Sequence, residues 1–158
     1  MALLKDIFLE HSIDIRTTPE KIWEFFLNLE ENYTAWHPQD HVVFKWLKGR
    51  PWEEGSVVYA EEIIHGKLHK LKFVVTRVVP KKEVEFSPAS RLLRTYFPKN
   101  AFIIEQKGDI CTFTATGHIR VGWLVSKFAR KKLEFGLAEA NRHMREEGEN
   151  LKAILEAS

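Results

Sequence analysis

The sequence predicts an α+β fold in which a curved antiparallel β-sheet wraps around one long C-terminal α-helix. Between residues 41 and 122, segments rich in Val, Ile, Phe and Thr alternate with Gly, Pro and Lys-Lys turns, as in an antiparallel meander. From residue 123 the apolar residues recur with helical spacing to the end of the chain. A sheet of this size must cover its apolar face, and the amphipathic helix is the only element long enough to do so.

The first elements are a strand that runs directly into a helix. The stretch IFLEHSIDI (7–15) alternates apolar and polar residues, which is typical of a half-buried strand. The next stretch, TTPEKIWEFFLNLEEN (17–32), has the signals of a helix start: Thr17 or Thr18 as N-cap, Pro19 in the first turn and Glu20 close behind.

The rest of the chain is expected to supply further strands and then helix. The expected strand segments are 41–49, 55–80, 82–88, 100–108 and 111–122. The helical pattern begins with WLVSKFARKKLEF (123–135), whose basic run at 130–132 is typical of solvated helix surface. An arrangement of this kind commonly leaves a cavity between helix and sheet, and the 11 Phe, 5 Trp and 3 Tyr could line it or simply fill the core.

Composition predicts one domain over residues 1–158, since the chain has the length of a single domain and contains no repeat or Pro/Gly-rich linker. A net charge of +2 argues against a nucleic acid or an anionic membrane as partner. The single cysteine, Cys111, rules out a disulfide within the chain and favours a reducing, cytoplasmic location. No apolar run is long enough to span a membrane, and the start has no signal-peptide pattern.

The closing helix carries a histidine and a glutamate one turn apart. His143 and Glu147 point the same way because four residues make about one turn. Glu147 also falls on the apolar stripe formed by Ala140, Met144, Leu151 and Ile154. A glutamate buried alone and ionised would cost several kcal/mol, so Glu147 must be protonated, paired or bound to a cation. Imidazole and carboxylate are ligands that suit zinc.

The order of elements resembles the helix-grip fold of the START and Bet v 1-like (SRPBCC) superfamily, over nearly the whole chain. The resemblance rests on IRTTPEKIWEFF (15–26) and HMREEGENLKAIL (143–155). It implies an internal cavity that holds a hydrophobic small molecule. Fold alone does not define a function, so a more specific signal is needed.

Three segments together are similar to the 2,4-diacetylphloroglucinol hydrolase family: YTAWHPQDH (33–41), AEEIIHGKL (60–68) and RHMREEGENLK (142–152). The resemblance implies a zinc ion held by a histidine after the first helix, a glutamate on a strand, and the His/Glu pair of the last helix. These ligands map to His37, Glu62, His143 and Glu147, with His41 as the alternative to His37.

The strand ligand is either Glu61 or Glu62, because alternation sends the two side chains to opposite faces of a strand. Residues two apart on a regular strand share a face, so if Leu71 and Phe73 point inward, counting back in steps of two favours Glu61. A bulge at Gly66 would favour Glu62, which also matches the family in its spacing to Ile64 and Gly66. Glu62 is the preferred prediction.

The function expected from these observations is a zinc-dependent hydrolase that cleaves a carbon–carbon bond in a small acylated phenol or β-diketone-like compound. Zinc would polarise the acyl carbonyl and activate water, with His41, His65 and Tyr33 as candidate acids, bases or hydrogen-bond donors. The alternatives are a carrier of a lipid or polyketide, or a polyketide cyclase or aromatase. In a carrier, Arg91 or Arg94 would neutralise Glu147. The sequence is compatible with an oligomer.

Overall fold

The computed structural model describes residues 3–157, which form a seven-stranded antiparallel sheet and five helices. The strand order across the sheet is β1-β7-β6-β5-β4-β3-β2. The strands are β1 (Leu4–Ile15), β2 (His41–Lys48), β3 (Val57–Ile64), β4 (Lys67–Val79), β5 (Glu83–Pro88), β6 (Lys99–Lys107) and β7 (Ile110–Gly122). The helices are α1 (Pro19–Leu27), α2 (Leu29–Trp36), α3 (Arg91–Tyr96), α4 (Trp123–Phe128) and α5 (Arg130–Glu156). This is the predicted fold class, which is therefore confirmed.

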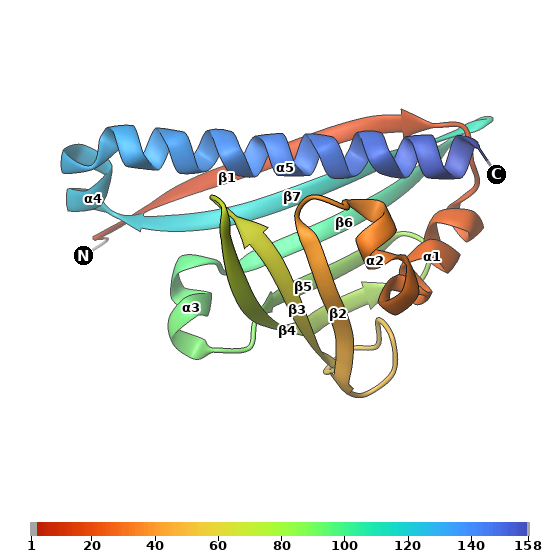
Figure 1. Ribbon diagram of the computed structural model, residues 1–158, viewed down its shortest axis with the longest axis horizontal. Helices are drawn as coiled ribbons and strands as arrows, with labels where there is room; N and C mark the ends of the chain where they lie inside the picture. The colour runs from red at the N-terminus through yellow and green to blue at the C-terminus, as the bar shows by residue number, and fades with distance from the viewer. Residues whose placement is uncertain (1–2, 158) are drawn as a thin grey trace.

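The sheet curves around α5 (Figure 1). Strands β1 and β7 run along the helix, whereas β2, β3 and β4 cross below it. Helix α5 comes very close to β1 at Gly148, where a Cβ atom would lie 3.2 Å from the ring of His11 and 3.3 Å from Ile13. Glycine at this position therefore lets the helix and the strand approach each other.

The expected first helix forms as two short helices. Thr18 is the N-cap, with its hydroxyl accepting from the backbone N–H of Lys21, and Pro19 occupies the first turn. The helix stops at Asn28, whose side-chain amide donates to the carbonyl of Glu24. A second helix, α2, starts immediately afterwards and ends at Trp36, so that His37–His41 lie in and after the loop that enters β2.

The core is aromatic and lies at the end of the sheet that α1 and α2 cover. The Phe26 ring stacks on Phe102 and Phe113 and packs edge-on against Trp36 and Trp52. Leu151 and Leu155, from the C-terminal half of α5, are buried in the same cluster. Truncation of a core phenylalanine or tryptophan of this kind costs about 3–5 kcal/mol. The N-terminal half of α5 contributes no residue to this core cluster.

The β3–β4 hairpin decides which of the two glutamates faces inward. Ile64 pairs with Lys67, so the turn consists of His65 and Gly66 alone, both with positive φ (54° and 74°). A two-residue turn places Ile64 and Lys67 on the same face of the sheet. An odd-numbered residue on β4 therefore shares its face with an even-numbered residue on β3, so Glu62 lies on the same face as Leu71 and Phe73. The parity argument for Glu61 is therefore wrong, because it carried odd numbering through the turn.

Two features of the chain were not expected from the sequence. Residues 91–96 form the short helix α3, capped by the Ser90 side chain, and the helical segment after residue 122 is divided at Ala129 into α4 and α5. Within residues 3–157, no helix combines the length and the hydrophobicity needed to cross a bilayer.

Candidate functional site: a polar cluster at the end of an apolar pocket

A pocket of about 320 Å³ lies between the sheet and the N-terminal half of α5. Its wall is mostly apolar and comes from several strands and from α5. It includes Leu9, Phe44, Val58, Phe86, Phe102, Ile119 and Met144. The volume is at the lower end of the range of about 300–1,000 Å³ that is typical of small-molecule sites.

Five of the polar side chains that line this pocket lie close to one another, and two buried histidines, His37 and His41, contact them from behind without lining the pocket. We call the following seven residues the polar cluster: Tyr33, His37, Asp40, His41, Glu62, His143 and Glu147. They come from α2, the loop that follows it, the first residue of β2, the inner face of β3, and α5. Residues far apart in the sequence are thus gathered at the point where α2, β2 and α5 meet.

Glu147 lies between two imidazole rings. Its Oε2 atom is 3.1 Å from Nε2 of His41, and its Oε1 atom is 3.3 Å from Nε2 of His143. His41 is 2% exposed and Glu147 8% exposed. Glu147 is also fixed through its backbone, because Nε1 of Trp36 donates to its carbonyl oxygen at 2.9 Å. The predicted i, i+4 contact between His143 and Glu147 therefore exists, and His41 is a second imidazole partner of Glu147.

The other nitrogen of each ring is already bound to an acceptor. Nδ1 of His41 lies 2.9 Å from the carbonyl oxygen of Tyr33, and Nδ1 of His143 lies 2.9 Å from Oδ2 of Asp40. Because a carbonyl can only accept, His41 must carry a proton on Nδ1, which leaves the lone pair of the neutral ring on Nε2. Both rings therefore direct Nε2 toward the Glu147 carboxylate.

The contact between His41 and Glu147 is not a satisfied hydrogen bond. His41 Nε2 is buried and has no hydrogen-bond partner among the described residues, although a carboxylate oxygen lies 3.1 Å away. In a neutral His41, that distance would place a nitrogen lone pair against an oxygen lone pair. A proton or a cation between the two atoms would remove this repulsion.

The charges in the cluster reinforce one another. Burial disfavours the charged form of His143, but Glu147, Glu62 and Asp40 outweigh it and raise its pKa. Burial likewise disfavours ionised Glu147, and the two histidines lower its pKa below the usual range. Without a metal, His143 and Glu147 are thus an ion pair in which the carboxylate is buried and the imidazolium is partly exposed.

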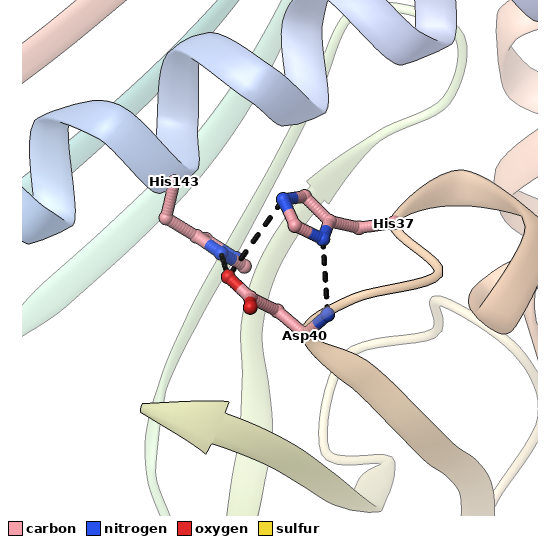
Figure 2. Close-up of side chains that lie close together, drawn as sticks. All are labelled: His37, Asp40 and His143. Atoms are coloured by element: carbon pink, nitrogen blue, oxygen red, sulfur yellow. Dashed lines mark hydrogen bonds and ion pairs between the residues drawn. The ribbon is translucent and has the colours of Figure 1, made fainter. Parts of the chain in front are cut away.

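His37 and Asp40 form a second layer beside His143 (Figure 2). The backbone N–H of Asp40 donates to Nδ1 of His37, while Nε2 of His37 lies 3.1 Å from Glu146 Oε1 and 3.7 Å from Asp40 Oδ2. Both ring nitrogens of His37 are therefore engaged within the protein. Asp40 binds His143, and although burial opposes ionisation, this hydrogen bond and the nearby His37 and Arg142 lower the pKa of Asp40.

Tyr33 and Glu62 form a hydrogen-bonded pair at the same end of the pocket. The Tyr33 hydroxyl donates to Oε1 of Glu62, and the Tyr33 ring stacks on His41 with centroids 3.9 Å apart. Burial raises the pKa of the Tyr33 hydroxyl, and Glu62 raises it further, so the hydroxyl remains protonated. Because the one O–H of Tyr33 is used for Glu62, the pair offers acceptors to a molecule in the pocket: the Tyr33 oxygen and Oε2 of Glu62.

The structure separates the remaining predicted site residues. Glu62 lines the pocket, whereas Glu61 is on the opposite face of β3, beside Tyr59. The pKa of the Tyr59 hydroxyl is raised mainly by burial and secondly by the Glu61 carboxylate. His65 lines the pocket from the β3–β4 turn, with its ring 5.3 Å from that of Phe135. His65 belongs to neither group of potential metal ligands among the described residues.

The expectation that Arg91 or Arg94 neutralises Glu147 is wrong. Arg94 donates to the carbonyls of Pro88 and Ala89, and Arg91 is exposed at the start of α3. Glu147 has histidine partners instead, because α3 packs against β5 and β7 and not against the C-terminal half of α5.

Sequence reasoning missed three contributors. Asp40 could have been suspected, since it directly precedes His41 in HPQDH, but loop conformation is not readable from sequence. Arg142 and Glu146 form an ion pair beside His37, in which Nη1 of Arg142 contacts both carboxylate oxygens of Glu146 (2.6 and 2.7 Å). Their i, i+4 spacing was the available signal.

Two groups of side chains have ligand atoms within 4.8 Å of one another, and either could hold a metal ion. The first is His41, His143 and Glu147, and the second is His37, Asp40 and His143. The first group fits a divalent cation better, because both Nε2 atoms are free of other partners and both Nδ1 atoms are held by an acceptor. Metal-binding histidines typically have this second hydrogen bond. Glu62 belongs to neither group, yet it lies close enough to influence His143.

Several solved structures have the same fold at low sequence identity. A major latex-like protein from Panax ginseng is 15% identical, with a TM-score of 0.62 over 90% of this chain and 99% of its own. Norcoclaurine synthase from Thalictrum flavum is 11% identical, with a TM-score of 0.64 over 83% and 86%. The di-domain aromatase/cyclase BexL is 11% identical, with a TM-score of 0.76 over 97% of this chain and 51% of BexL, so this chain spans about half of BexL.

The sequence itself was compared with protein families and with curated proteins. No curated protein matches it. Residues 7–156 match the family described as polyketide cyclase/dehydrase and lipid transport, which is nearly the entire chain. The chain therefore belongs to the polyketide cyclase/dehydrase and lipid transport family.

Proposed function

We propose that this protein binds a hydrophobic small molecule of polyketide or lipid chemistry between α5 and the sheet. The observation that carries the proposal is the apolar pocket of about 320 Å³ that ends at the polar cluster. An apolar wall with a few polar groups at one end suits a ligand with an apolar body and an oxygen-bearing end. The Tyr33 and Glu62 pair would bind that polar end.

The family and the structural neighbours support the same chemistry. The family name joins cyclases and dehydrases of polyketides with lipid transport. BexL is described as an aromatase/cyclase, and norcoclaurine synthase is described in complex with dopamine and hydroxybenzaldehyde. These compounds are small and aromatic, and the phenylalanines of the pocket offer rings against which such a molecule can pack.

Binding can be tested with the fluorescent probe 1-anilinonaphthalene-8-sulfonate. Gly136 lines the pocket, and a Cβ atom there would have no neighbour within 4 Å, so Gly136→Phe should place a ring in the pocket without disturbing the fold. We expect the wild type and Gly136→Ala to bind the probe equally, and Gly136→Phe to bind it about tenfold more weakly or worse. Equal binding by all three proteins would exclude this pocket as the ligand site.

A second candidate function is a metal-dependent hydrolase, and the arrangement of His41, His143 and Glu147 favours it. These three residues would hold a divalent cation such as zinc, with Glu62 as a further carboxylate nearby. When bound there, the cation would polarise a carbonyl group of the substrate. This candidate corresponds to the carbon–carbon bond hydrolysis implied by the resemblance to the 2,4-diacetylphloroglucinol hydrolase family.

The residues of the chain would then position an acylated phenol and move its protons. Hydrolysis breaks the bond between the ring carbon and the acyl carbon, adds OH to the acyl carbon, and adds a proton to the ring carbon. The Tyr33 hydroxyl is held protonated and donates to Glu62, so its oxygen can accept a hydrogen bond from a phenolic hydroxyl of the substrate. Glu62, whose Oε1 accepts from Tyr33, can take up a proton at its other oxygen, Oε2, and return it.

The hydrolase candidate can be tested with 2,4-diacetylphloroglucinol and zinc-loaded protein. We expect acetate and monoacetylphloroglucinol to appear together in proton NMR spectra, and we expect no acetate from His41→Ala. If the loaded protein binds the fluorescent probe but releases no acetate, hydrolysis of this compound is contradicted and the binding function stands.

A further inference from the structure

The segment from Trp123 to Phe135 carries large apolar side chains that the described structure leaves at least half exposed. We call it the 123–135 surface. Its side chains include Trp123, Leu124, Val125, Phe128 and Phe135, which are 50–79% exposed. Five such residues within thirteen positions are unusual for a solvent-facing helix, since contiguous apolar surface on a monomer commonly marks an interaction site.

The same segment is strongly basic, although the chain as a whole is nearly neutral. Lys127, Arg130, Lys131 and Lys132 lie within it, and no acidic residue occurs between Ile110 and Leu133. Arg130 is paired with Glu134 (2.9 Å), and Lys127 lies over the Trp123 ring. Lys131 and Lys132 are exposed and form no ion pair within residues 3–157.

Lys131 and Lys132 do not stabilise the helix that carries them. Residues 130–132 are the first turn of α5, where the helix dipole favours acidic side chains and disfavours basic ones. The helix also has no acidic residue in this turn and no side-chain cap at Ala129. Lys131 and Lys132 at this end therefore need an explanation outside the helix.

The 123–135 surface adjoins the pocket. Gly136, Glu139 and Ala140, in the turns of α5 that follow it, line the pocket, and so does Phe97 at the end of α3. Helices α3 and α4 lie at the same end of the molecule (Figure 1). α3 exposes Leu92 and Leu93 next to Arg91 and Arg94, so it repeats the combination of apolar and basic side chains.

We propose that the 123–135 surface docks on an anionic phospholipid membrane, with the adjoining pocket near the bilayer. The aromatic and leucine side chains enter the interfacial region, and the lysines and arginines contact lipid phosphates. A second copy of the chain fits less well, because a symmetric contact would bring two basic clusters together. The proposal does not rest on the proposed function, since docking requires neither a pocket ligand nor a metal.

Vesicle flotation tests the proposal with the full chain and no added ligand. We expect binding to phosphatidylcholine vesicles that contain phosphatidylglycerol, little binding to phosphatidylcholine alone, and loss of binding as salt is raised. Lys131→Gln with Lys132→Gln should weaken binding about fivefold for each charge removed. Leu124→Glu with Phe128→Glu should abolish it, and both positions are exposed, so the fold should not change.

Matched changes on β2 provide the control. Lys45→Gln with Lys48→Gln removes the same charge, and Leu47→Glu changes an exposed leucine that is 48% accessible; both should bind as the wild type does. The Trp123 emission should shift to the blue on anionic vesicles, and Trp123→Phe should remove the shift. Equal binding to neutral vesicles, no binding, or self-association that Phe128→Glu abolishes would each overturn the proposal.

Discussion

Glu147 has two histidine partners, which explains why a glutamate occupies the apolar stripe of α5. The carboxylate is buried, but each of its oxygens faces an imidazole nitrogen at 3.1 or 3.3 Å. Asp40 and the Tyr33 carbonyl fix the two rings from behind. In the metal-free protein the charge of His143 thus neutralises Glu147, and His41, His143 and Glu147 together would offer three ligands to a cation.

Replacing His41 or His37 separates direct ligands from supporting residues. We expect His41→Ala to abolish zinc binding, because Nε2 of His41 is directed at the site and has no hydrogen-bond partner among the described residues. His37→Ala should weaken binding about 10–100-fold, as is usual for outer partners of metal ligands. Calorimetric titration with zinc compares the two, and the reverse order would show that His37 is the ligand.

Replacing Glu147 tests both of its roles. Glu147→Gln should lower zinc affinity at least about tenfold, because it removes the charge that faces the cation. In the presence of a chelator it should also lower the free energy of unfolding by about 1–3 kcal/mol, because the His143 charge loses its partner. Urea denaturation with and without chelator measures both effects. Unchanged stability of the metal-free protein would show that the ion pair contributes nothing.

At this scale the sequence predicts part of the site. The pair of His143 and Glu147 follows from helical spacing, and Tyr33 and Glu62 do line the pocket. The choice between His37 and His41 depends on the path of a four-residue connection, which spacing does not determine. Asp40 was missed for the same reason, since its role depends on where the loop directs its side chain.

Helix α5 performs different tasks along its length. Its C-terminal half packs Leu151 and Leu155 into the aromatic core, its middle carries His143 and lines the pocket, and its first turn carries exposed basic residues. The close approach to β1 at Gly148 fixes the height of the helix above the sheet.

A larger residue at Gly148 should lift the helix from β1. Gly148→Leu would place side-chain atoms against His11 and Ile13, and we expect it to lower stability by about 1–3 kcal/mol. Gly136→Ala, in the same helix but with no neighbour within 4 Å, should raise stability by about 0.5–1 kcal/mol. Thermal or urea denaturation gives both values. A stable Gly148→Leu protein would mean that the contact does not constrain the helix.

The order and type of most elements follow from sequence, because alternation, turn residues and helical periodicity are local signals. The sequence did not predict where helices are interrupted or how the residues of neighbouring strands are paired. Asn28 divides one expected helix, Ala129 divides another, and a two-residue turn reverses the parity between β3 and β4. Each depends on a backbone conformation at one or two residues, and the wider amphipathic pattern does not contain that information.

At the scale of the whole molecule, the space between the sheet and α5 is filled by the aromatic core at one end and contains the pocket at the other. Aromatic rings from α1, α2 and the sheet fill the space under the C-terminal half of α5, whereas the N-terminal half covers the pocket. The polar cluster lies between the two regions. A ligand in the pocket would therefore meet apolar walls along its body and the polar cluster at its end.

The central claim is that this pocket binds a hydrophobic small molecule with its polar end at the cluster. The most direct measurement is a crystal structure of the protein soaked with 2,4-diacetylphloroglucinol. We predict the ring of the compound among Phe44, Phe86 and Phe102, with an oxygen within hydrogen-bond distance of Tyr33 or Glu62. Density for the compound only outside the pocket, or none at saturating concentration, would contradict the claim.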